Sequence, residues 1–236
     1  MTPLILLPGL ACDAALYRAQ APALAGPREV RVSDVHTRRA TLPAMAAALL
    51  AEHPGPLALV GSSMGGMLAL EVWRQAPDRV HGLALLGTTA RADTPDLLRL
   101  RADAIRLFEQ GRMDEVLQAN LAFAFHPANA ADGALAADYL AMVRRAGPAQ
   151  LIAQNRAVMA RADLRAELPR VACPTLVMVG DSDRLTPPEG AEEIAATIPG
   201  ARLELLPRCG HLLTWERPAR VLAALQDWLD GLPRRA

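Results

Sequence analysis

The sequence of 236 residues contains no lysine, so all 25 of its basic residues are arginine. They balance 25 acidic residues, the formal net charge is zero, and no basic patch stands out. We therefore expect no nucleic-acid partner. No run of about 18 apolar residues occurs, so no membrane-spanning helix is predicted. The apolar stretch at the N-terminus is short, interrupted by proline and without a basic flank, and does not predict a signal peptide.

Cysteine is scarce. Cys12, Cys173 and Cys209 lie far apart, their number is odd, and none belongs to a C-x-x-C pair. This pattern favours neither a disulfide framework nor a zinc knuckle, and it predicts reduced thiols in the cytoplasm. The five histidines are dispersed without H-E-x-x-H spacing. We therefore expect no metal and no organic cofactor.

Short apolar runs recur along the chain between longer segments of helical character. Four of the six runs are continuously apolar, which is typical of strands covered on both faces in a parallel sheet. The other two keep apolar residues at alternate positions. The six runs are residues 4–7, 29–33, 57–60, 83–86, 175–179 and 202–206.

Helical patterns fill the segments between these runs. The alternation of strands and helices predicts a doubly wound, mainly parallel α/β fold with about six strands. The predicted crossover helices are residues 41–52, 66–76, 189–198 and 218–229.

One stretch breaks the alternation, because residues 91–166 contain helical patterns but no convincing strand. We call these residues the cap segment and predict that they form a helical insertion on an α/β core of residues 1–90 and 167–236. Four helices are predicted within it, at residues 95–110, 113–119, 133–145 and 148–161. Leu121, Phe123 and Phe125 are spaced by two, which predicts an extended or irregular connection there.

Residues Gly61-Ser62-Ser63-Met64-Gly65 form a G-x-S-x-G motif between a predicted strand and a predicted helix. In that setting a tight turn lifts the central serine hydroxyl above the sheet, and small flanking residues leave room for the turn. The following helix N-terminus offers N–H groups to a developing anion. Ser63 is therefore the predicted nucleophile, and the alternative is a glycine-rich turn without a catalytic role.

A serine hydroxyl becomes a good nucleophile when a base removes its proton. Only His211 directly follows a late predicted strand, so it is the predicted base. His36 follows the second strand, but the chain order serine, acid, histidine would then fail. His53 and His81 are predicted at the opposite edge of the sheet, and His126 lies in the cap segment.

The histidine also needs an acidic partner that fixes its tautomer. Asp181 and Asp183 both follow the fifth predicted strand, and on position alone either could serve. An aspartate here could also cap the helix that begins near Pro187. Asp181 suits a turn immediately after Gly180, which favours Asp183.

Three separated segments, in this order, resemble the α/β-hydrolase superfamily over nearly the whole chain. The resemblance is to a broad group of small carboxylesterases, acyl-carrier-protein methyl esterases, enol-lactonases, carbon–carbon bond hydrolases and cofactor-free perhydrolases. The family's G-x-x-D pattern followed by T-P assigns the acid role to Asp183. The segments are Gly61-Ser62-Ser63-Met64-Gly65-Gly66, then Gly180-Asp181-Ser182-Asp183 with Thr186-Pro187, then Gly210-His211 with Glu216 and Pro218.

The same resemblance implies an oxyanion hole built from the backbone N–H groups of Met64 and Leu10. Relatives usually carry His-Gly-x in the loop after the first strand, where this chain has Pro8-Gly9-Leu10. That departure keeps the backbone donor but removes a supporting histidine. Relatives also often begin with an antiparallel hairpin, which is expected to be absent here because the first run begins at Leu4.

These residues predict a serine hydrolase that cleaves a small carboxylic ester or thioester through an acyl-enzyme. An aspartate nucleophile is disfavoured because serine occupies that position. The alternatives are carbon–carbon hydrolysis, lactonase or perhydrolase chemistry on the same triad, or a non-catalytic ligand-binding scaffold. Phe123, Phe125 and His126 are the candidate substrate-binding residues, the expected partner is a small-molecule ester, and no oligomeric state is predicted.

Overall fold

The computed structural model describes residues 2–26 and 28–233. In them, six strands form one fully parallel sheet in the order β2-β1-β3-β4-β5-β6. All six predicted strands are confirmed, with ends that differ by a few residues. The strands are β1 (Leu4–Leu7), β2 (Val30–Val32), β3 (Leu57–Ser62), β4 (Val80–Leu86), β5 (Thr175–Gly180) and β6 (Arg202–Leu206).

Helices connect the strands, and the four predicted crossover helices are confirmed. Thr41 caps one of them, since its hydroxyl accepts the N–H of Ala44, as expected of threonine at this position. The helices around the sheet are α1 (Gln20–Leu24), α2 (Val35–Arg38), α3 (Leu42–Glu52), α4 (Met64–Gln75), α9 (Pro188–Thr197), α10 (Leu213–Glu216) and α11 (Pro218–Asp230), with 3-10 turns η1 (Ala14–Tyr17), η2 (Pro77–Arg79) and η3 (Arg165–Arg170).

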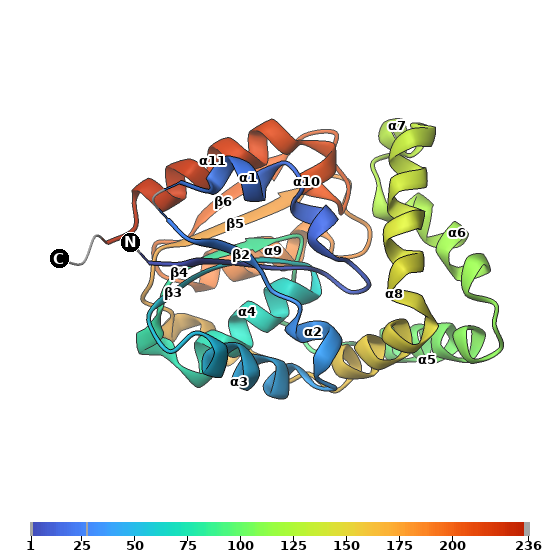
Figure 1. The fold of residues 1–236 in the computed structure, drawn as a ribbon, viewed down its shortest axis with the longest axis horizontal. Helices are drawn as coiled ribbons and strands as arrows, with labels where there is room; N and C mark the ends of the chain where they lie inside the picture. The colour runs from blue at the N-terminus through green and yellow to red at the C-terminus, as the bar shows by residue number, and fades with distance from the viewer. Residues whose placement is uncertain (1, 27, 234–236) are drawn as a thin grey trace.

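Helices cover both faces of the sheet, α1 and α11 on one side and α3 and α4 on the other (Figure 1). Side chains of β1 alternate between the two cores. Leu4 and Leu6 pack in the cluster that contains Leu225 of α11, whereas Ile5 and Leu7 pack with residues of α3 and α4. This double burial explains why the central strands are apolar at every position.

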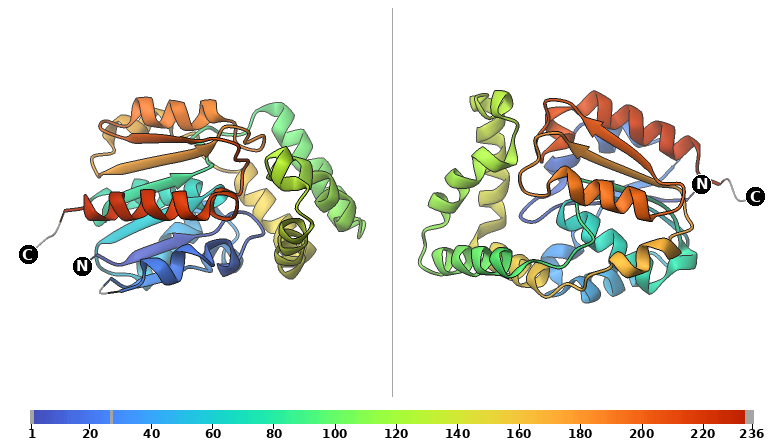
Figure 2. Two further views of the ribbon diagram at one scale, coloured as in Figure 1. Left: turned by 90° about the horizontal axis from the view of Figure 1, so that it is seen from above. Right: turned by 180° about the vertical axis from the view of Figure 1, so that it is seen from behind.

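The cap segment forms helices between β4 and β5, and these helices lie beyond one end of the sheet, away from the chain termini (Figures 1 and 2). That end carries the carboxyl ends of the parallel strands, where open α/β sheets bind their ligands. The two predicted helices after residue 132 join at a kink, because Gly147 has φ 74° and Pro148 follows it. The helices are α5 (Pro95–Glu109), α6 (Met113–Ala124), α7 (Pro127–Ala130) and α8 (Gly133–Met159).

The extended connection predicted around Leu121 and Phe123 is wrong, because α6 continues to Ala124. Leu117 and Ala124 are buried and Leu121 packs against them, so the buried face follows helical spacing. Phe123, which suggested a spacing of two, points away from that face and is 38% exposed.

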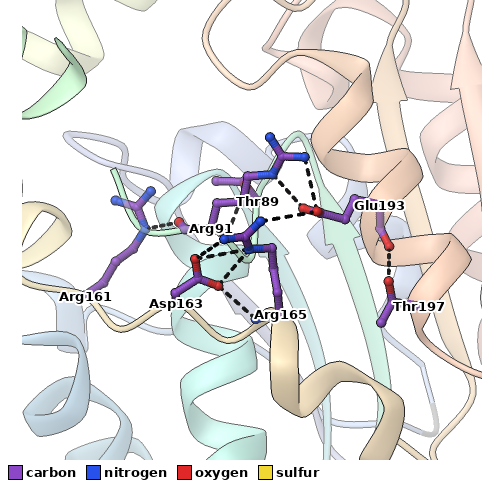
Figure 3. Close-up of polar contacts among 7 residues, drawn as sticks. All are labelled: Thr89, Arg91, Arg161, Asp163, Arg165, Glu193 and Thr197. Atoms are coloured by element: carbon purple, nitrogen blue, oxygen red, sulfur yellow. Dashed lines mark hydrogen bonds and ion pairs between the residues drawn. The ribbon is translucent and has the colours of Figure 1, made fainter. Parts of the chain in front are cut away.

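The chain enters the cap segment near Arg91 and leaves it near Arg165, and these two connections to the core lie side by side (Figure 3). The Nε atom of Arg161 donates to the carbonyl oxygen of Arg91 at 2.9 Å. Arg91 and Arg165 both form ion pairs with Glu193 of α9, at 2.7 and 3.6 Å. The start and end of the cap segment are thus tied to each other and to the core.

Within the described residues, no helix has both the length and the apolar character required to cross a membrane.

Candidate active site

Ser63 sits in the sharp turn between β3 and α4 with φ 55° and ψ −118°. A positive φ is strained for a residue with a side chain, and such strain is common at functional sites. The turn leaves no room for side chains on its glycines. A Cβ atom on Gly61 would lie 2.2 Å from the carbonyl oxygen of Gly65, and one on Gly65 would lie 2.0 Å from that of Leu7. The two glycines of the motif therefore permit the turn that exposes Ser63 at the sheet edge.

The end of β4 holds this turn and also borders the predicted acid and base. The N–H of Ser63 donates to the carbonyl of Leu86 at 2.9 Å, and the hydroxyl of Thr88 donates to the carbonyl of Ser63 at 2.7 Å. A Cβ atom on Gly87 would lie 3.1 Å from Asp183 Oδ2 and 3.4 Å from His211 Nδ1. Leu86, Gly87 and Thr88 therefore contact the Ser63 turn and lie next to Asp183 and His211.

His211 and Asp183 form a buried pair. The Nδ1 atom of His211 lies 2.8 Å from Asp183 Oδ2, and the side chains are 9% and 0% exposed. The other carboxylate oxygen accepts the N–H groups of Leu185 and Thr186, each at 2.9 Å. The hydroxyl of Thr186 also donates to Asp183 Oδ2 at 2.9 Å. Because Nδ1 faces the carboxylate, the neutral ring is expected to carry its proton on Nδ1, which leaves Nε2 as the acceptor.

Burial and the neighbouring charges have opposite effects on the pKa values of this pair, and the neighbouring charges have the larger effect. Burial lowers the pKa of His211, but the Asp183 carboxylate, its hydrogen bond and the charge of Glu216 raise that pKa above its ordinary value. Burial likewise opposes a charge on Asp183, while His211 and the hydrogen bonds from Thr186 hold its pKa below the usual range. The site therefore holds an ionised carboxylate against an imidazole of increased basicity.

The predicted oxyanion donors flank the Ser63 turn. Met64 is the first residue of α4, so its N–H has no acceptor within that helix. The loop that contains Leu10 packs directly on Ser63, since a Cβ atom on Gly9 would lie 3.2 Å from Ser63 Cβ. Both backbone donors are thus next to the serine.

The loop after β1, which begins with Pro8, is supported by hydrogen bonds from a buried glutamine and a buried histidine. Gln154 of α8, only 1% exposed, accepts the N–H of Ala11 through Oε1 at 2.7 Å. Its Nε2 atom donates to the carbonyl of His36 at 3.1 Å. The ring of His36 in turn lies 2.9 Å from the carbonyl of Cys12 through Nε2. A helix of the cap segment therefore braces the loop that carries Leu10.

A comparison with known families agrees with this fold. Residues 2–218 match the family model described as the alpha/beta hydrolase fold. The chain belongs to the α/β-hydrolase fold family. This α/β hydrolase is 31% identical to the pimeloyl-[acyl-carrier protein] methyl ester esterase of Nitrosomonas europaea over 67% of its own length, a match that spans 65% of that protein.

Two further relatives cover nearly the whole α/β hydrolase. A pimeloyl-[acyl-carrier protein] methyl ester esterase of Aromatoleum aromaticum is 29% identical over 97% of this chain and 98% of that protein. The solved structure of a thermophilic esterase from Thermogutta terrifontis superposes with a TM-score of 0.88 at 29% identity, over 98% of this chain and 90% of that one.

His36 and Asp181 have other partners in this α/β hydrolase. Asp181 accepts the N–H groups of Arg208 and Cys209 at 2.8 and 3.2 Å, so it braces the loop that leads to His211. Burial raises the pKa of the Cys209 thiol, which is a small buried side chain here. His36 is buried against the loop after β1, as described above.

The three candidate substrate-binding residues lie in different surroundings. Phe125 is 1% exposed and packs edge-to-face against Tyr139, with ring centroids 5.7 Å apart, so it contributes to the core under the cap segment. Phe123 is partly exposed, and the guanidinium of Arg184 lies 4.4 Å from its ring centroid. His126 caps α7, where its Nδ1 atom accepts the N–H of Ala128.

Across residues 2–26 and 28–233, no group of three or more histidine, cysteine, aspartate or glutamate side chains is arranged to hold a metal ion. Sequence reasoning missed Gln154, because a glutamine inside a helical insertion has no motif around it. It assigned Glu216 only to a family pattern, although this carboxylate contacts the His211 loop directly.

Proposed function

We propose that this protein is a serine esterase in which Ser63, Asp183 and His211 act as the catalytic triad. The observation that carries the proposal is the 2.8 Å contact between His211 Nδ1 and Asp183 Oδ2 beside the strained turn that presents Ser63. A G-x-S-x-G turn between a strand and a helix, followed in the chain by an acid and a histidine, is the arrangement in which α/β hydrolases present a catalytic serine.

In the proposed reaction, the Ser63 Oγ atom attacks the ester carbonyl carbon and its proton moves to Nε2 of His211. Asp183 stabilises the imidazolium without taking the proton. The N–H groups of Leu10 and Met64 bind the oxygen that becomes negatively charged, and removal of one such donor typically costs about 10²–10³ in turnover. The alcohol leaves with the proton from His211, and the acyl group remains on Ser63.

Water completes the cycle. His211 removes a proton from a water molecule as the water oxygen attacks the acyl carbonyl carbon, and the same N–H groups stabilise the second anion. Collapse breaks the bond to Ser63 Oγ, returns the proton to that atom and releases a carboxylic acid. The residues of this chain supply every group that this scheme requires.

We propose that the cap segment selects the acyl group. It lies beyond the carboxyl ends of the strands (Figure 2), and the turn that holds Ser63 follows the carboxyl end of β3. We propose that the exposed ring of Phe123, which lies near Arg184, contacts the acyl group of the substrate. Phe125 is buried and instead stabilises the packing of the cap segment. His126 remains a weaker candidate for substrate contact, because its ring caps α7.

Two relatives are named as methyl ester esterases, so a methyl ester of an aliphatic acid is the first natural substrate class to test. The free cysteines support the proposal of a cytoplasmic location. A panel of p-nitrophenyl and methyl esters, a thioester, an enol lactone and a carbon–carbon hydrolase substrate tests the proposal. Hydrolysis of esters by the wild type but not by Ser63→Ala is the expected result, and turnover confined to the carbon–carbon substrate would contradict it.

A further inference from the structure

Glu216 is a buried carboxylate that lies between the core and the cap segment. It belongs to α10, and it is only 7% exposed. Its Oε1 atom accepts the N–H of Gly210, the residue before His211, at 2.9 Å. Its Oε2 atom accepts the N–H of His126 at 2.8 Å and the side-chain amide of Asn129 at 2.7 Å. One carboxylate therefore joins the His211 loop to the turn between α6 and α7.

The backbone of the two segments is in direct contact at the same place. The N–H of His211 donates to the carbonyl of Ala124 at 3.0 Å. A Cβ atom on Gly210 would lie 2.5 Å from the backbone nitrogen of His126 and from the carbonyl carbon of Phe125. The His211 loop can approach the cap segment this closely because residue 210 is glycine.

We propose that Glu216 is a positioning residue through which the α6–α7 turn fixes the alignment of His211. The proposal rests on the function of His211 as the base, proposed above. Among the residues that the structure describes, the Glu216 side chain forms no hydrogen bond with Ser63, Leu10 or Met64. It acts through the loop backbone and through its charge.

The groups that face His211 come from several elements. Asp183, from the loop after β5, and Glu216, from α10, carry the two negative charges that raise the pKa of His211. The Cys209 thiol on the loop itself has a raised pKa and stays neutral. In the cap segment, the titratable residue next to this loop is His126, whose backbone N–H donates to Glu216. Removal of the Glu216 charge therefore lowers the pKa of His211.

The position requires a carboxylate, because both of its oxygens accept hydrogen bonds from donors. A glutamine has nearly the same shape but carries one oxygen and one NH₂ group. In Glu216→Gln, the amide oxygen can accept a hydrogen bond either from Gly210 or from His126 and Asn129. The NH₂ group then faces the remaining N–H donors, with which it cannot form a hydrogen bond. A buried N–H left without an acceptor is costly, so the loop and the turn are expected to separate.

The pH dependence of Ser63 labelling by a fluorophosphonate tests the proposal without knowledge of the natural substrate. Glu216→Gln is expected to slow labelling by roughly tenfold to a hundredfold, since small misplacements of catalytic groups have effects of that size. The base must be neutral to accept a proton, so a lower pKa of His211 moves the acidic limb of the rate profile to lower pH. A purely structural role of Glu216 would leave that limb where it is.

Two further variants complete the experiment. Glu115→Gln removes an exposed carboxylate from α6 and is expected to match the wild type in rate and in pH profile. Asn129→Leu removes only the side-chain amide that donates to Glu216 from the cap segment. This variant is expected to slow labelling severalfold and to leave the acidic limb of the rate profile at the same pH. This variant keeps the test decisive if Glu216→Gln does not fold, because a wild-type rate for Asn129→Leu would overturn the proposal.

The outcomes separate this proposal from the proposed function. An unlabelled Ser63 in the wild-type protein would contradict the serine mechanism itself. Normal labelling of the wild type, with the same acidic limb in Glu216→Gln, would overturn only the role of Glu216. A shifted limb together with slower labelling supports both.

Discussion

The backbone N–H of His211 donates to the carbonyl oxygen of Ala124, so the proposed base in the core is hydrogen-bonded to the last residue of α6. A second hydrogen bond between the core and the cap segment involves the loop after β1, where Gln154 of α8 accepts the N–H of Ala11. The cap segment thus supports both the loop of the base and the loop of a predicted oxyanion donor. Changes in this segment are therefore expected to affect turnover as well as substrate choice.

Asp183→Asn is expected to reduce turnover far more than Asp181→Asn. Asparagine cannot hold the imidazole in the required tautomer, and such a loss reaches on the order of 10⁴-fold. Asp181 only accepts backbone N–H groups of the loop before His211, so its replacement has a smaller effect. Steady-state kinetics of both variants on one ester provide the measurement. Equal losses, or a larger loss for Asp181→Asn, would overturn the assignment of the acid.

The pH profile of ester hydrolysis is expected to show an acidic limb with its midpoint above the ordinary histidine pKa of about 6.5. The neighbouring carboxylates raise the pKa of His211, and only the neutral imidazole can accept the proton of Ser63. Activity therefore rises with pH through that raised pKa and is lost below it. The measurement is kcat/KM of the free enzyme between about pH 5 and 9. A midpoint well below 6.5 would show that burial outweighs the carboxylates.

Gln154→Leu is expected to lower kcat roughly tenfold with a smaller change in KM. The leucine leaves the N–H of Ala11 without its buried acceptor, which loosens the loop that carries Leu10. Gln118→Leu, on the exposed face of α6, is the matched control. If both variants had the kinetics of the wild type, the bracing by Gln154 would have no catalytic consequence.

Phe125→Ala and Phe123→Ala are expected to have different effects. Removal of the buried Phe125 ring, which packs on Tyr139, is expected to lower the free energy of unfolding by about 3–5 kcal/mol. Phe123 is partly exposed, so its replacement is expected to leave stability nearly unchanged and to shift the preferred acyl length in a p-nitrophenyl ester series. Thermal unfolding and this series test the pair. A loss of stability in Phe123→Ala alone would contradict the distinction.

The sequence predicted the sheet well because burial on both faces leaves a continuous apolar run for each central strand. The glycines around Ser63 also predicted their turn, since a Cβ atom at either position would collide with backbone. The structure of residues 121–125 could not be read in the same way. Phe123 and Phe125 suggested a spacing of two, but one is exposed and the other is buried just after the end of α6.

The supporting contacts of the site were the least predictable. Gln154 and Ala11 are 143 positions apart, and nothing in their local sequence signals that they meet. The same holds for Glu216 and Asn129, which the fold brings together from α10 and α7. Local patterns reveal strands, turns and reactive residue types, whereas these long-range hydrogen bonds depend on how the cap segment docks on the core.

The central claim is that Ser63 is a nucleophile activated by His211, and fluorophosphonate labelling followed by intact mass and peptide mapping tests it most directly. The account predicts one covalent adduct per chain, located on Ser63 and absent in Ser63→Ala, whose turnover is expected to fall on the order of a millionfold. His211→Ala is expected to slow the labelling of Ser63 strongly. An adduct on Ser62, or full ester hydrolysis by folded Ser63→Ala, would contradict the claim.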